Sequence, residues 1–189
     1  MKRVHQTVLI ASTLLASWIG MQAAHETGHV LGAWMTGGEV RKLVLDPLTI
    51  SRTDLGKNPH PLVVVWAGPI FGMMFPLALL AGAASLRMPG TFVLRFFAGF
   101  CLIANGTYIS IGSWNAIGDC GEMLRHGSQV WQLWLFGAVT IPGGFWLWHR
   151  QGTGFGFGAA GSQVGLGVTY VTLVASLLLL VLGLSIGVE

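Results

Sequence analysis

Five consecutive residues, His25-Glu26-Thr27-Gly28-His29, could carry out chemistry. Residues four apart share one face of a helix, so His25 and His29 can offer two imidazole nitrogens to one metal ion. Glu26 is then placed to act as a general base towards a water molecule. Zinc suits such a site, because it accepts histidine nitrogen and leaves room for water when it has three protein ligands. The pattern predicts a hydrolytic zinc centre that needs a third ligand.

A chance match, or two core histidines with ordinary partners, is the alternative interpretation of this motif. The motif lies within an apolar segment of about thirty residues. Two histidines and a glutamate are costly in such a segment unless they pair, bind or react. This cost favours the metal site.

The composition indicates which class of protein carries the motif. Hydrophobic residues make up 53% of the 189 residues and charged residues only 9%, with a mean hydropathy of +0.68. We therefore expect an all-α polytopic membrane protein with about five transmembrane helices. The apolar runs that predict them cover about 7–36, 61–86, 91–114, 129–149 and 166–188.

The third ligand follows from counting membrane crossings. His25 lies roughly 27 Å along the first helix from Thr7, near the far side of a hydrocarbon core about 30 Å thick. Three crossings return the chain to that same surface just before Asp119 and Glu122. Asp119 is the predicted ligand, with Glu122 as the alternative and Cys120 behind both. Asp119 and Glu122 also fit a capping box at the start of a short helix that ends at Arg125.

The segment 39–54, on the same surface, changes to a strand-like pattern. Residues 42–45 and 48–53 resemble two short strands around Asp46-Pro47. One interpretation is an edge that pairs with an extended substrate, and the other is a connecting hairpin. Both remain open from the sequence.

Small and polar residues indicate how the helices pack. Gly28 and Gly32 in the first helix and Gly68 and Gly72 in the second form small-residue faces that allow close contact. Pro69 is expected to kink the second helix or to free a carbonyl. Asn105, in the middle of the third helix, is either an interhelical contact or a site residue, and the sequence favours the interhelical contact.

Taken together, the motif, Ala67-Gly68-Pro69 and Gly118-Asp119 resemble the site-2 protease family of intramembrane zinc metalloproteases. The resemblance covers roughly the first 125 residues and implies a minimal member without a PDZ or other inserted domain. It implies that His25, His29 and Asp119 hold one zinc ion and that Glu26 is the catalytic base. Gly68, Pro69 and Asn115 become candidate contacts for substrate or oxyanion. The chain departs from the family pattern at Gly72, where many members carry asparagine.

The expected function is hydrolysis of a peptide bond in or near a substrate's transmembrane segment, as in regulated intramembrane proteolysis. The alternative is a catalytically silent membrane protein of the same fold that binds metal or acts as a scaffold. Expected partners are the lipid bilayer, a membrane-protein or transmembrane-peptide substrate, and a separate regulatory protein. The net charge of +3 comes without a basic run, which argues against nucleic acid.

The expected organisation is one membrane-embedded domain over 1–189, with a catalytic core at about 7–125 and accessory helices at about 129–188. The ten lysines and arginines divide equally between the two membrane surfaces, so their distribution does not choose an orientation. The family resemblance implies a bacterial or archaeal cell membrane with the active site towards the cytosol.

Overall fold

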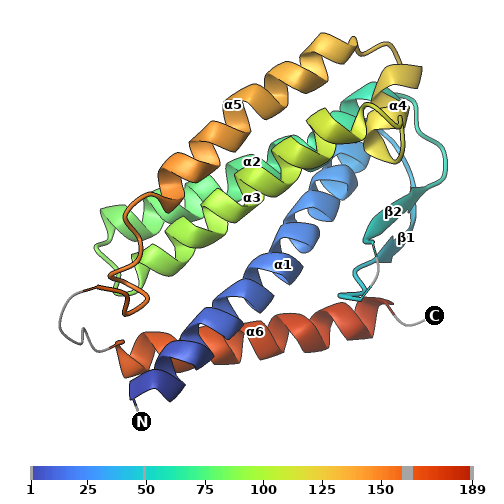
Figure 1. Ribbon diagram of the computed structural model, residues 1–189. Helices are drawn as coiled ribbons and strands as arrows, with labels where there is room; N and C mark the ends of the chain where they lie inside the picture. The colour runs from blue at the N-terminus through green and yellow to red at the C-terminus, as the bar shows by residue number, and fades with distance from the viewer. Residues whose placement is uncertain (1, 49, 159–163, 188–189) are drawn as a thin grey trace.

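Five long helices form the body of the protein in the computed structural model, which describes residues 2–48, 50–158 and 164–187. They are α1 (Lys2–Met35), α2 (Pro61–Ser85), α3 (Thr91–Gly112), α5 (Val130–Trp148) and α6 (Leu166–Gly187). Each is long and apolar enough to cross a membrane, which confirms the expected class and the five spans. Helices α2, α3 and α5 run alongside one another, whereas α6 lies across the N-terminal part of α1 (Figure 1).

Turn residues set the ends of these helices. The first ends at Met35, and Gly37 follows with φ of +73°, the left-handed conformation that glycine adopts without strain. Pro61 opens α2 at a position where its missing N–H costs nothing. This helix then continues through Pro69 and Pro76.

A two-stranded antiparallel hairpin follows α1, as expected, and consists of β1 (Val40–Val44) and β2 (Arg52–Leu55). The predicted limits of the second strand were wrong, because pairing starts at Arg52 instead of Leu48. The Asp46 carboxylate accepts a hydrogen bond from the backbone N–H of Leu48 (2.9 Å), which closes a local turn there. Thr49 and Val188, which also fell in predicted elements, lie outside the described residues.

A short helix, α4 (Asp119–Arg125), carries the predicted third ligand. Cys120 and Met123 on α4 are fully buried in a cluster with Val65 of α2, Ile109 of α3 and Leu133 of α5. This cluster joins four helices at one end of the molecule, where the hairpin also lies (Figure 1). It determines which face of α4 turns towards α1.

Helices α1 and α2 approach closely through the predicted glycine face. A side chain at Gly28 would come closer than 3.0 Å to the backbone of Ala67 and Gly68, and one at Gly32 would meet the Ala67 side chain. The expected packing of these two helices is therefore confirmed for Gly28 and Gly32. Gly72 instead faces Asn105 of α3.

Candidate metal centre

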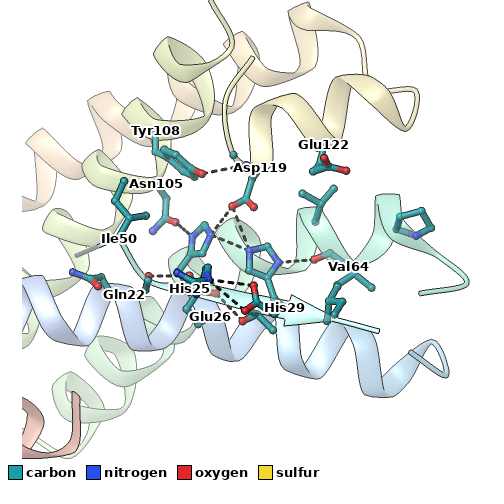
Figure 2. A pocket seen from close by; sticks show the side chains of 18 of the residues that line it. Gln22, His25, Glu26, His29, Ile50, Val64, Asn105, Tyr108, Asp119 and Glu122 are labelled. Atoms are coloured by element: carbon teal, nitrogen blue, oxygen red, sulfur yellow. Dashed lines mark hydrogen bonds and ion pairs between the residues drawn. The ribbon is translucent and has the colours of Figure 1, made fainter. Parts of the chain in front are cut away.

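Helix α1 presents both histidines of the motif to the interior. His25 and His29 are each 7% exposed, and their Nε2 atoms lie 3.1 Å apart. One Asp119 oxygen, Oδ2, lies 2.8 Å from His25 Nε2 and 3.3 Å from His29 Nε2. The structure thus brings together residues from α1 and α4 that are 94 positions apart in the chain (Figure 2).

The three atoms have a separation that fits zinc. A tetrahedral zinc ion with bonds of about 2.0–2.1 Å holds neighbouring ligand atoms about 3.3 Å apart. The distances among the three atoms are 2.8, 3.1 and 3.3 Å. A small movement of these side chains would therefore accommodate the ion.

The far side of each imidazole is held by a hydrogen-bond acceptor. His25 Nδ1 donates to Asn105 Oδ1 at 2.7 Å, and His29 Nδ1 donates to the carbonyl oxygen of Val64 at 2.9 Å. The amide nitrogen of Asn105 donates to the carbonyl of Cys101, which fixes the oxygen towards His25. With their protons on Nδ1, both rings direct an Nε2 lone pair towards Asp119. Three electron-rich atoms this close require a cation between them, either protons or a metal ion.

Asp119 is suited to be an anionic ligand. Burial acts to raise the pKa of its carboxyl group, but interactions with His25 and His29 outweigh burial and hold that pKa well below its usual range. Its backbone N–H donates to the Tyr108 hydroxyl at 3.1 Å. Gly118 precedes it with φ of +61°, and a side chain there would strike that hydroxyl. Tyr108 and Gly118 together set the position of the carboxylate.

Neither alternative ligand points towards the histidines. Glu122 lies on the cavity wall, but its carboxylate pairs with Arg125 Nη1 at 2.5 Å and with His126 Nε2 at 3.3 Å. The Cys120 thiol donates to the carbonyl of Tyr108 at 3.1 Å, and burial raises its pKa to about 11. The capping-box interpretation is wrong, because the residue that caps α4 is Gly118 and no side chain bonds there.

Glu26 lies beside the candidate metal ligands and is 4% exposed. Its two carboxylate oxygens accept hydrogen bonds from Ser51 Oγ at 2.8 Å and Thr53 Oγ1 at 2.7 Å. Alternate residues of an extended segment share a face, which is how both hydroxyls reach one carboxylate. The hairpin therefore does more than connect helices, since it orients Glu26.

A cavity of about 950 Å³ contains these groups. Its walls come from α1, from residues 50–56 around β2, from the start of α2 and from α3, and Asp119, Glu122 and His126 form part of its lining. Gly68, Pro69 and Asn115 are not among the lining residues. Asn115 lies exposed in the turn after α3, and a side chain at Gly68 would collide with the His29 ring. Gly68 thus gives the imidazole its space.

The sequence interpretation underestimated several residues. Asn105 was expected to join helices, and it does so by accepting a hydrogen bond from His25 of α1, which also makes it part of the site. The signal was a polar amide within an apolar helix. Tyr108 lies three residues later on the same helix face, a spacing that could have linked it to Asn105. Ser51 and Thr53 carried only the weaker signal of hydroxyls two residues apart in an extended segment.

Comparison with known protein families gives one match. The model of the family described as Peptidase M50B-like matches residues 4–114. The chain belongs to this family. No curated protein and no solved structure matches it. The match confirms the resemblance to the site-2 proteases, and the family supports a protease held in the membrane. Asp119 lies beyond the matched residues, so its place beside the histidines comes from the geometry.

Proposed function

We propose that this M50B-like protein is an intramembrane zinc metalloprotease that hydrolyses a peptide bond in or near a transmembrane segment of its substrate. The observation that supports this most is the set of three ligand atoms with Glu26 held beside them. His25, His29 and Asp119 would hold the zinc ion. When bound, zinc supplies Lewis acidity towards a carbonyl oxygen and lowers the pKa of water to about 7.

The chain's own residues then move the proton. Glu26 accepts a proton from the attacking water at its carboxylate and delivers that proton to the nitrogen of the leaving amine. Ser51 and Thr53 keep both carboxylate oxygens directed by their hydrogen bonds. Asn105 and the Val64 carbonyl keep both imidazoles in the form that presents Nε2. These four contacts prepare the site before substrate arrives.

The site is also placed for a substrate within the bilayer. It is formed by the C-terminal part of α1, the first turn of α2 and the last turns of α3, which lie at one end of the helices (Figure 1). We propose that it lies shallowly in the membrane and that β2, which lines the cavity, pairs with the unwound substrate chain. Hydrolysis requires such unwinding, because a helix keeps its scissile carbonyls in internal hydrogen bonds.

The first prediction concerns the general base. Glu26→Gln keeps the shape of the side chain but cannot accept the water's proton, so cleavage of a membrane-protein substrate should fall by a factor of at least about 100. Zinc content, measured by metal analysis of the purified protein, should equal that of the wild type, since Glu26 is not a ligand.

The matched control is Glu39→Gln, which removes a carboxylate from the polar segment after α1, outside the cavity lining. This variant should cleave as the wild type does. Undiminished proteolysis by the Glu26→Gln variant would refute the proposed mechanism. No observation favours the catalytically silent alternative, because Glu26 is present and held beside the ligands.

A further inference from the structure

Gln22 is a buried polar side chain whose role the proposed mechanism does not explain. It is 5% exposed, and neither its amide nitrogen nor its amide oxygen has a hydrogen-bond partner among the residues that the structure describes. Buried polar groups in proteins are nearly always paired, because an unpaired group has lost its bonds to water without replacement. The cost is greater at membrane depth, where water is scarce.

The position of Gln22 indicates what it meets. It is one of the residues that line the cavity, and it precedes His25 by three positions and Glu26 by four on α1. Residues at these spacings share a helix face. Figure 2 shows Gln22 on the same side of α1 as His25, with Ile50 and Asn105 nearby. Gln22 therefore borders the space that a substrate must occupy.

The chemistry of the amide points to a main-chain partner. A carboxamide offers one acceptor oxygen and one nitrogen donor side by side, and the N–H and C=O of one residue in an extended chain point to the same edge of that chain. The amide and such a residue can therefore form a pair of hydrogen bonds. A substrate that remains helical has no free N–H and C=O to offer, because the helix uses them internally. A segment unwound for cleavage exposes both groups. The Gln22 amide can therefore form hydrogen bonds with the main chain of an unwound substrate and not with that of a helical one.

We propose that Gln22 binds the N–H and C=O of one residue of the substrate main chain, on the bilayer side of the scissile bond, and so stabilises the unwound segment. This inference rests on the proposed protease function. Gln22 lies about 6 Å along the helix axis from Glu26, which corresponds to about two residues of extended chain. Trp18 and Met21 line the cavity further towards the N-terminus of α1 and give the next part of the substrate an apolar wall.

The test measures binding without turnover. Full-length, zinc-loaded protein carrying Glu26→Gln is titrated in bicelles with a fluorescein-labelled Leu-Ala transmembrane peptide of about 20 residues that contains a central Gly-Ala-Gly segment. Adding Gln22→Leu, which keeps the size of the side chain without its amide, should weaken binding about tenfold through the loss of two hydrogen bonds. Leucine removes a buried unpaired amide, so the thermal midpoint should not fall.

A second set of peptides locates the contact. In each, one backbone amide is replaced by an ester, which removes one N–H and weakens one carbonyl acceptor. With Gln22 present, the peptide that carries the ester at one position near the central segment should bind about tenfold more weakly than the parent peptide. With Gln22→Leu, the same ester should no longer weaken binding, as expected if the Gln22 amide contacts that substrate amide directly.

Thr13→Val is the matched control. Thr13 also lies on α1 and is 1% exposed, and within the described part of the chain its hydroxyl has no hydrogen-bond partner, but it does not line the cavity. Its substitution should leave peptide binding unchanged. Equal binding by the Gln22→Leu variant, with the same response to every ester, would overturn the inference. The proposed protease function is tested separately, by cleavage with Glu26 intact, so the two can fail independently.

Discussion

At the scale of single residues, the two candidate histidine ligands are held in different ways. His29 is oriented by a backbone carbonyl, that of Val64, which no substitution removes. His25 is oriented by the side chain of Asn105, which substitution can remove. Partners of this kind fix the ring and its tautomer, and their loss usually weakens metal binding 10- to 100-fold.

The second prediction follows from this difference. Asn105→Leu removes the acceptor for His25 Nδ1, so zinc affinity should fall about 10- to 100-fold in a competition titration with a chelator. Asn105→Asp retains an oxygen at the same place and should keep most of the affinity. Equal affinity in the wild type and the leucine variant would mean that Asn105 does not orient the ligand.

The third prediction separates the two carboxylates of α4. Asp119→Ala should abolish stoichiometric zinc in metal analysis, because it removes one of three converging ligand atoms. Glu122→Ala should retain zinc, since the Glu122 carboxylate pairs with Arg125 and His126. The reverse result would assign the third ligand to Glu122.

At the scale of the elements, α4 has only seven residues and depends on its neighbours. An isolated helix of this length is not stable in water. Cys120 and Met123 fix it by their burial among α2, α3 and α5. This contact, and not the helix itself, decides that the Asp119 carboxylate faces α1.

The fourth prediction tests this anchoring. Met123→Ala leaves a cavity in the cluster and should lower the free energy of unfolding by about 2–5 kcal/mol. Zinc affinity should fall as well, because Asp119 loses its fixed position. Arg125→Ala is the matched control, since that exposed side chain forms a surface pair expected to contribute at most about 1 kcal/mol. Denaturant titration in mild detergent measures both variants, and equal stabilities would contradict the proposed role of Met123.

Helices α3 and α5 also approach each other closely at glycine residues, as α1 and α2 do. Side chains added at Gly99 and Gly144 would each approach the backbone carbonyl of the other residue to 3.0 Å or less, and one at Gly137 would approach the carbonyl of Gly106 to 3.0 Å. The paired glycines are seven residues apart on each helix and let the backbones meet. This packing supports the face of α3 that carries Asn105 and Tyr108.

At the scale of the whole molecule, the candidate metal site connects distant parts of the chain. His25 of α1 and Asp119 of α4 are 94 residues apart, and Thr53 of β2 and Ser51 just before it contribute the contacts to Glu26. A bound ion would therefore join two helices that meet only in the folded protein. We propose that residues 7–125 form the catalytic core and that α5 and α6 are accessory helices packed against it.

The fifth prediction concerns removal of the metal. A ligand that binds only the folded state stabilises it by about 4.1 kcal/mol at a thousand times its dissociation constant. Chelation should therefore lower the thermal midpoint of the wild-type protein, and added zinc should restore it. The Asp119→Ala variant should show almost no response to either treatment. A wild-type midpoint that does not respond to chelation would mean that the ion does not join α1 and α4.

Several features followed from the sequence alone, because they depend on local periodicity and length. The spacing of His25 and His29 places both on one helix face whatever surrounds them. Hydropathy gave five spans, because a bilayer demands about twenty apolar residues for each crossing. Three crossings then predicted that Asp119 returns to the end of the helices where the histidines lie, because an odd number of crossings has this result however the helices pack.

Other features were decided only by the tertiary structure. Asp119, Cys120 and Glu122 are near neighbours in sequence, and a helix points them in different directions. Burial of Cys120 and Met123 in the hydrophobic core decides which of the three side chains faces α1. The partners of Glu26 and His25 likewise come from residues 51–53 of the hairpin and from α3, whose distances from α1 no local pattern encodes. The motif was a property of the sequence, whereas the pocket around it, including the unpaired amide of Gln22, is a property of the fold.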